Sequence, residues 1–274
     1  MHNMEPNFHP SDIEIAFHQA QLLARAASAL DCFELVRTHI YFHLYDFPLH
    51  EIYRSIFRNP PSWVRMGCAL KAGGIFRQAM IHMIGQHPHW PWTTNNNLPD
   101  CLRSLIRRKA DEISTFKSTI DGLLFASTLT VNGQAISILT CDETTINAWL
   151  VVSAWRNWFC HSLAQVGAAA RNRNELDLSM YWLMAQGGEA YLPLASVLGN
   201  LRAVKGVELA PEDTADITNY LREMKEYAAE QVKPLCVHSM LDVNEHRISY
   251  FTGINIANSE LPWASGDGMD EHID

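Results

Sequence analysis

Common phosphate-binding and hydrolase motifs are missing from the 274-residue sequence, which has no Gly-x-Gly-x-x-Gly loop, no Walker loop and no Gly-x-Ser-x-Gly elbow. Nucleotide binding by those loops and serine-hydrolase chemistry are therefore not indicated. The six cysteines never pair as Cys-x-x-Cys, which disfavours a zinc module or a dithiol redox motif. Basic residues are outnumbered, since 21 Lys and Arg face 30 Asp and Glu, for a formal net charge of -9. We therefore expect no nucleic-acid partner.

The sequence also lacks an uninterrupted hydrophobic run of the about 18 residues that a membrane span requires. Its most apolar long stretch, residues 144–170, is interrupted by Asn147, Arg156, Asn157, His161 and Gln165. The first residues have neither the basic region nor the apolar core of a signal peptide, and the last ones form no lipidation box. We expect no membrane partner, a cytoplasmic or nuclear location, and free thiols.

Helical patterns dominate what is present, and 47% of the residues are hydrophobic. A long helix is predicted from Pro99, and another from Pro211 with a buried stripe. The stripe is expected to contain Ile217, Leu221, Met224 and Ala228. The sequence thus predicts a mainly all-α fold, an irregular multi-helix bundle.

Local signals predict where elements begin, break and turn. Two capping boxes, residues 11–14 and 140–143, are expected to open helices, and Gly73-Gly74 is expected to separate two others. Asn132-Gly133 lies between two short β-prone runs and is typical of a type I′ turn, so one small hairpin is predicted near residues 128–138.

The domain prediction follows from these elements. Residues 1–10 are expected to be a flexible N-terminus and residues 11–264 a single helical domain, with possible sub-lobes at 11–127 and 140–264. Residues 265–274 are acidic and small, so a disordered tail is predicted there.

Histidines are the sharpest candidates for chemistry. His39 and His43 are four residues apart on a predicted helix, a spacing that can place two imidazoles on one metal ion, and His50 could approach them. The other interpretation is a half-buried helix edge. No cysteine and no suitably placed acid completes a ligand set, so no metal site is favoured and no cofactor is expected.

A second cluster lies in a proline-rich loop. His82, His87 and His89 stand close to Trp90 and Trp92, which indicates either a pocket mouth where a ligand would stack and hydrogen-bond, or a loop fixed by packing.

Arg156 and His161 lie on a helix that is apolar on most of its girth. They are interpreted either as members of a structural ion pair or as polar groups of a cavity.

Several short stretches, in a shared order, resemble one known family. The stretches are Gln19–Cys32, Leu35-Val36, Asn59–Trp63, Ile75–Ala79, His82–Gly85, His87–Trp92, Leu98-Pro99, Lys109, Tyr250–Thr252 and Glu260–Trp263. In them the chain resembles the helical region of fungal BTB/POZ-type proteins, the part that follows the BTB β-sheet. The resemblance implies an all-α module whose role in the family is mostly unassigned and usually taken to be protein interaction.

The likeness covers most of residues 15–264, whereas a BTB domain of about 110 residues has no counterpart before Ser11. The family's dimerising and cullin-docking surface is therefore expected to be largely missing, which puts cullin docking in doubt.

Two functions remain open from the sequence. The first is a non-enzymatic protein-interaction or regulatory module, in which tryptophans serve as contact anchors and the acidic charge favours basic partners. The alternative is a small-molecule-binding or catalytic accessory protein of fungal specialised metabolism, with the histidines and Arg156 lining a pocket.

Overall fold

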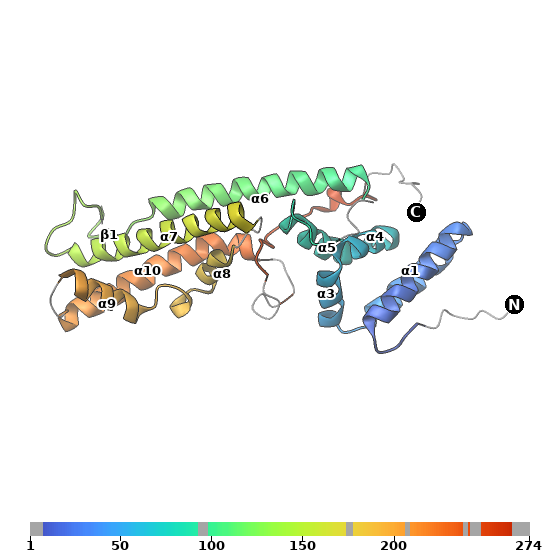
Figure 1. Ribbon diagram of the computed structural model, residues 1–274, viewed down its shortest axis with the longest axis horizontal. Coiled ribbons are helices and arrows are strands. Elements are labelled where there is room, and N and C mark those ends of the chain that lie inside the picture. Colours follow the sequence, from blue (N-terminus) through green and yellow to red (C-terminus); the bar gives the residue numbers. More distant parts are fainter. Residues whose placement is uncertain are drawn as a thin grey trace. The chain divides into compact units, whose positions relative to one another are not determined.

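The computed structural model describes residues 8–92, 98–173, 178–205, 209–237, 241 and 248–264, without the side chains of 169–173 and 204–205. Within these residues the chain forms ten α-helices and one two-stranded antiparallel sheet (Figure 1). The predicted mainly all-α fold with one small hairpin is therefore confirmed. In the described part of the chain, no helix is both long and apolar enough to cross a membrane. The proposed acidic tail, 265–274, and residues 1–7 lie outside the described residues.

The chain divides into two compact units. Unit 1 comprises residues 1–111, 238–247 and 254–274, and unit 2 comprises residues 112–237 and 248–253. The boundary lies within helix α6 (Asp100–Ala126), and the segment after α10 contributes to both units. The predicted sub-lobes are continuous stretches of sequence, whereas each unit combines separate segments.

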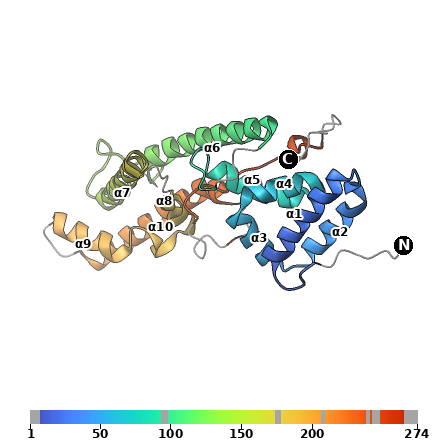
Figure 2. The same ribbon diagram turned by 45° about the vertical axis from the view of Figure 1, so that its right-hand side comes forward.

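Unit 1 is built from short helices. They are α1 (Ile13–Ala29), α2 (Phe33–Tyr45), α3 (Leu49–Arg58), α4 (Pro60–Leu70), α5 (Gly73–Gly85) and the first part of α6. Helices α1 and α2 run side by side (Figure 2). Helices α4 and α5 approach closely, because a Cβ atom at Gly67 would lie 2.9 Å from the backbone N and Cα of Phe76.

The break between α4 and α5 differs from the prediction. Lys71 ends α4 in the left-handed region, with φ 53°, and both Gly73 and Gly74 belong to the first turn of α5. A non-glycine residue thus takes the conformation usually left to glycine.

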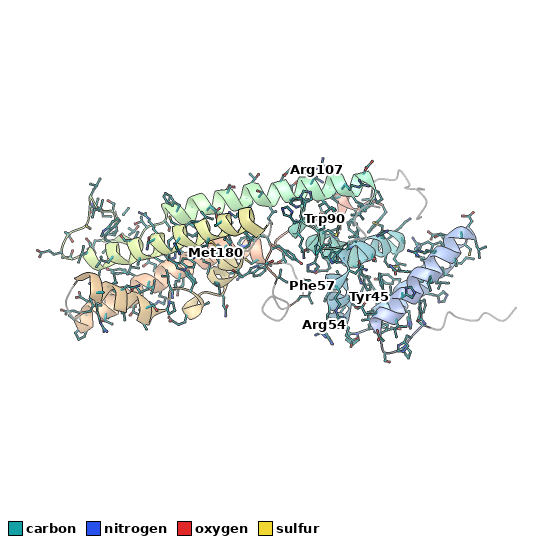
Figure 3. All side chains as sticks on the ribbon, in the orientation of Figure 1. Tyr45, Arg54, Phe57, Trp90, Arg107 and Met180 are labelled. Atoms are coloured by element: carbon teal, nitrogen blue, oxygen red, sulfur yellow. The ribbon has the colours of Figure 1, made fainter. Side chains whose placement is uncertain are left out.

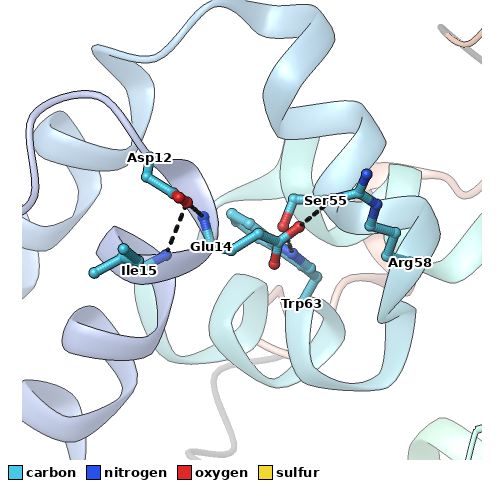
Figure 4. A network of polar contacts seen from close by, with 6 residues as sticks. All are labelled: Asp12, Glu14, Ile15, Ser55, Arg58 and Trp63. Carbon is cyan, nitrogen blue, oxygen red and sulfur yellow. Dashed lines mark hydrogen bonds and ion pairs between the residues drawn. The ribbon is translucent and has the colours of Figure 1, made fainter.

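The predicted capping box at residues 11–14 is also wrong in detail. Asp12, not Ser11, caps α1, and its carboxylate accepts hydrogen bonds from the backbone N–H groups of Glu14 (2.9 Å) and Ile15 (3.2 Å) (Figure 4). One carboxylate oxygen serves two of the N–H groups that a helix start leaves free.

A similar correction applies at residues 140–143. Asp142 accepts hydrogen bonds from the N–H groups of Thr144 and Thr145, and α7 (Ile146–Arg173) begins only after this turn. The Asp142 side chain therefore accepts hydrogen bonds from the N–H groups of a turn that precedes the helix, and not from those of the first turn of α7.

Unit 2 contains the long helices. After the second part of α6 come β1 (Thr130–Val131), β2 (Gln134–Ala135), α7, α8 (Ser179–Gln186), the 3-10 turn η2 (Gly188–Ala190), α9 (Leu194–Lys205) and α10 (Pro211–Cys236). The hairpin is shorter than predicted, but Asn132 and Gly133 have φ 52° and 80°, as a type I′ turn requires. The flanking Leu129 and Ile136 are buried in the core of unit 2.

The core of unit 2 lies where α10 packs on α7 and α8. Ile217, Leu221, Met224 and Ala228 are all buried there, so the stripe predicted for α10 is confirmed. Trp155 and Phe159 of α7 stack with ring centroids 5.3 Å apart. The apolar side of α6 is less completely buried than that of α10. Phe116 and Leu123 of α6 remain more than two-fifths exposed.

The segment after α10 makes hydrogen bonds within each of the two units. In unit 2, Thr252 and Gly253 donate backbone hydrogen bonds to the carbonyl of Leu235. In unit 1, the guanidinium of Arg77 donates to the carbonyl of Ile256 (2.9 Å) and to the side chain of Asn258 of η3 (Asn258–Glu260).

Candidate functional site

The predicted histidine–tryptophan cluster lies in unit 1, on α5 and the loop after it. His82 is buried, with its ring edge-on to Phe57 of α3 at 5.4 Å between centroids, whereas His89 is exposed. His87 contacts Trp90 edge-on at 5.7 Å. Burial, followed by the positive charge of Arg107, lowers the pKa of His87.

Both indoles of this cluster are hydrogen-bonded. Trp90, labelled in Figure 3, donates its Nε1–H to the carbonyl of Met83 at 2.7 Å, and Trp92 donates to the carbonyl of Arg58 at 3.1 Å. These bonds tie the loop to α5 and to the end of α3. They are the contacts expected of a loop fixed by packing, and a ligand-binding role for these residues stays a prediction.

The candidate metal ligands lie on α2 (His39 and His43) and in the first turn of α3 (His50). His39 and His50 are exposed, whereas His43 stacks on Phe8 with ring centroids 4.4 Å apart. Within the described residues, no group of three or more His, Cys, Asp and Glu side chains is placed to hold a metal ion.

Arg156 and His161 lie in unit 2, on α7. Arg156 donates from Nε (3.2 Å) and from one terminal nitrogen (2.8 Å) to the carbonyl of Ser127, just beyond the end of α6. A cation at a helix C-terminus interacts favourably with the carbonyls left free there. The partner is thus a backbone carbonyl, not the acid expected for an ion pair. His161 is exposed and pairs with Gln165.

The structure reveals an apolar surface that sequence reasoning missed. Helices α1 and α2 each bury one side and carry large hydrophobic residues on the opposite side. We call these residues and the connection between the helices the α1–α2 surface, with exposed fractions in parentheses: Ile15 (44%), Leu22 (50%), Leu30 (75%), Leu35 (77%) and Phe42 (63%).

The spacing explains why the exposed residues of each helix share one face of that helix. Ile15 and Leu22 are seven residues apart, as are Leu35 and Phe42, so each pair is two turns apart on its helix. Both helices are apolar on two sides, and the sequence pattern could not tell which side packs inward.

The α1–α2 surface lies in an acidic stretch. Residues 12–46 contain five carboxylates (Asp12, Glu14, Asp31, Glu34 and Asp46) and two arginines (Arg25 and Arg37). Ion pairs join Glu14 to Arg58 (3.4 Å) and Glu34 to Arg37 (3.0 Å). The stretch that carries this surface thus has more carboxylates than arginines, and two of its carboxylates are ion-paired.

A second site that sequence reasoning missed lies in unit 2, around a buried lysine of α10. The side chain of Lys225 is 6% exposed. Its ammonium donates to the carbonyl of Gly188 at 2.6 Å, lies 3.9 Å from the Glu189 carboxylate, and stands 5.4 Å from the centre of the Tyr191 ring. Burial lowers the pKa of Lys225, and Glu189 opposes that effect.

Two buried polar groups of unit 2 have no partner among the described residues, and one of them, the Tyr191 hydroxyl, belongs to the ring that Lys225 faces. The Tyr191 hydroxyl and the Trp155 indole Nε1 are both buried and make no hydrogen bond. They are neighbours: burial raises the pKa of Tyr191 to about 12, and the Trp155 N–H opposes that rise. Neither group, however, makes a hydrogen bond to the other. We call Lys225, Tyr191 and Trp155 the donor cluster.

No protein-family model matches this chain, and neither a curated protein nor a solved structure matches it. The functional proposals therefore depend on the α1–α2 surface and on the donor cluster.

Proposed function

We propose that this protein is a non-enzymatic protein-interaction module and that the α1–α2 surface is its docking surface. The observation that carries the proposal is the exposure of five large apolar side chains on one helical pair, with Leu35 and Leu30 three-quarters exposed. Full burial of one such side chain contributes about 1.5–3 kcal/mol, so a partner that covers several of them gains substantial binding energy. Contiguous exposed apolar patches commonly mark interaction sites.

The partner we propose is a protein segment that presents apolar side chains among lysines and arginines. The excess of carboxylates over arginines in residues 12–46, together with the formal net charge of -9, favours such a partner electrostatically. The resemblance to the helical region of fungal BTB/POZ-type proteins supports the same class of function. We propose that the protein acts in the cytoplasm or the nucleus. We do not propose that it docks to a cullin.

Site-specific photo-cross-linking tests this proposal. Phe42 is replaced by p-benzoylphenylalanine in the full chain, the protein is irradiated in fungal extract, and cross-linked peptides are identified by mass spectrometry. The matched control carries the same residue at Ser104, an exposed position of α6 in unit 1. We expect position 42, but not position 104, to capture one recurrent protein through a basic segment with apolar residues.

The same experiment can contradict the proposal. Equal capture from both positions would mean nonspecific adhesion, and capture of a second copy of this chain would make the surface a homodimer interface. Capture of an acidic segment would overturn the proposed partner chemistry. As a further check, capture from position 42 should weaken as salt rises, because charge attraction is screened.

A further inference from the structure

The donor cluster of unit 2 offers more donors than acceptors, because among its three side chains only the Tyr191 hydroxyl oxygen can accept a hydrogen bond. An indole N–H can donate but not accept, and an ammonium has three N–H donors, of which the Gly188 carbonyl takes one at 2.6 Å. The Tyr191 hydroxyl can also donate. A buried donor without an acceptor costs about 1–3 kcal/mol, so this arrangement favours whatever brings an oxygen acceptor to it.

Aromatic rings form the walls of this cluster. Trp158 lies on Tyr191 with ring centroids 4.6 Å apart, and Phe159 stacks on Trp155 at 5.3 Å. Apolar walls with a few converging polar groups and one cation are the usual make-up of a small-molecule site. The positive charge selects an anionic acceptor over a neutral one.

The loop that covers Lys225 is held in an unusual backbone conformation. Gly187, Gly188 and Leu192 have φ 67°, 55° and 43°, and leucine rarely adopts a left-handed conformation. A Cβ atom at Gly187 or Gly188 would have no neighbour within 4 Å, so these two glycines are loosely packed. Residues 187–193, which we call the α8–α9 loop, thus begin with two loosely packed glycines and have a strained leucine near their end.

Two contacts hold this loop closed. Lys225 binds the Gly188 carbonyl, and the Glu189 carboxylate accepts from the backbone N–H of Leu194 at 3.0 Å, at the start of α9. The Lys225 ammonium therefore holds the loop through the Gly188 carbonyl, and it is also the only cation of the donor cluster.

We propose that the donor cluster is a binding site for a small carboxylate with an aromatic or alkyl body, and that the α8–α9 loop opens to admit it. On binding, Lys225 exchanges the Gly188 carbonyl for the carboxylate of the ligand. The Trp155 N–H and the Tyr191 O–H donate to the same carboxylate, and the aromatic rings contact its apolar body. This site is separate from the α1–α2 surface and does not depend on the proposed function.

Benzoate is a suitable probe, with benzamide as its neutral counterpart. Titration of the full chain is followed by isothermal calorimetry and by the NMR signal of the Trp155 indole N–H, assigned with Trp155→Phe. We expect saturable benzoate binding that shifts this signal, and no comparable effect of benzamide. Lys225→Met should weaken benzoate binding at least about tenfold, and Tyr191→Phe by a smaller factor, because each removes a donor.

Unit 2 offers a matched control in Lys117. Its ammonium lies 5.3 Å from the centre of the Tyr181 ring but is paired with Asp121 at 2.6 Å. Lys117→Met should leave the benzoate affinity unchanged. If Lys225→Met fails to fold, the indole signal in the unaltered protein still decides the matter.

Three results would overturn the proposal. The first is a Trp155 indole signal that stays in place up to benzoate concentrations on the order of 10 mM, which corresponds to negligible affinity. The second is equal weakening by Lys117→Met and Lys225→Met. The third is a crystal structure grown with benzoate in which a single water molecule bridges Trp155 and Tyr191, because the donor cluster would then be a hydration site only.

Discussion

The two units treat their indole N–H groups differently. In unit 1, Trp63 donates to the Ser55 hydroxyl at 3.0 Å, and Trp90 and Trp92 donate to backbone carbonyls. In unit 2, the buried Nε1 atoms of Trp155 and Trp182 have no partner among the described residues. These tryptophans of unit 1 thus link neighbouring segments by hydrogen bonds, whereas Trp155 and Trp182 of unit 2 have indole N–H groups without an acceptor among the described residues.

Their helical glycines differ as well. Gly67 of unit 1 lies where two helices cross with backbone contact, whereas a Cβ atom at Gly167 or Gly199 of unit 2 would have no neighbour within 4 Å. Unit 1 thus combines a close backbone approach at Gly67 with hydrogen-bonded indoles. In unit 2 the buried indoles of Trp155 and Trp182 have no hydrogen-bond partner among the described residues.

The largest difference between the two units is expected from glycine substitutions, which should act in opposite directions. Gly67→Ala should destabilise unit 1 by about 1–3 kcal/mol or more, because the new Cβ atom meets the backbone of Phe76, which cannot move aside without shifting α5. Gly199→Ala should stabilise unit 2 by about 0.5–1 kcal/mol, since alanine favours a helix. Hydrogen exchange of amides in each unit measures both changes. Equal effects would remove the packing difference.

Replacing one tryptophan in each unit sharpens the comparison of hydrogen bonding. Trp63→Phe and Trp155→Phe both remove a fully buried indole, but only the first breaks a hydrogen bond and leaves the Ser55 hydroxyl without its donor. We expect Trp63→Phe to cost about 1–3 kcal/mol more in free energy of unfolding. Urea unfolding monitored by circular dichroism tests this, and a larger loss for Trp155→Phe would contradict it.

Alkaline pH should destabilise both units, through different groups. Burial raises the pKa of Tyr45 and Cys68 in unit 1, and of Tyr191 and Cys236 in unit 2, each to about 12. A raised pKa means that the folded state favours the neutral form. The resulting stability is complete below the ordinary pKa, near 9 for the thiols and 10 for tyrosine, and is lost as pH rises towards 12.

Tyr191→Phe separates the two contributions. The variant should lose less stability than the unaltered protein between pH 10 and pH 12, because it lacks the hydroxyl that ionises. Thermal unfolding across this pH range is the measurement. An unchanged alkaline profile would mean that the pKa of Tyr191 is the same in the folded and the unfolded protein, which would contradict the prediction.

The smallest effect on stability is expected at the α1–α2 surface. Phe42→Gln should change the free energy of unfolding by no more than about 0.5 kcal/mol, because the side chain is 63% exposed. On the same helix, Ile40→Ala should cost about 2–5 kcal/mol, since Ile40 is fully buried. Chemical denaturation compares them, and a large loss for Phe42→Gln would mean that this residue serves folding instead of docking.

Part of the candidate sites could be read from the sequence and part could not. The histidine–tryptophan cluster was recognisable because its members are close in the chain. The donor cluster was not, because Trp155, Tyr191 and Lys225 come from α7, a loop and α10 and carry no spacing signal. Lys225 lies at the edge of the buried stripe of α10, and its sequence position does not show that its ammonium meets the loop at Gly188.

The sequence by itself determined the elements whose signals are local: the helical periods, the Asn132-Gly133 turn, and the stripe of α10 that packs inward. These depend on backbone preference and on residues a few positions apart. Tertiary structure alone decided which apolar side of α1 and α2 is buried, and that residues after α10 belong to both units. Each of these choices depends on which distant surface is available to cover an apolar face or satisfy a polar group, and no stretch of neighbouring residues contains that information.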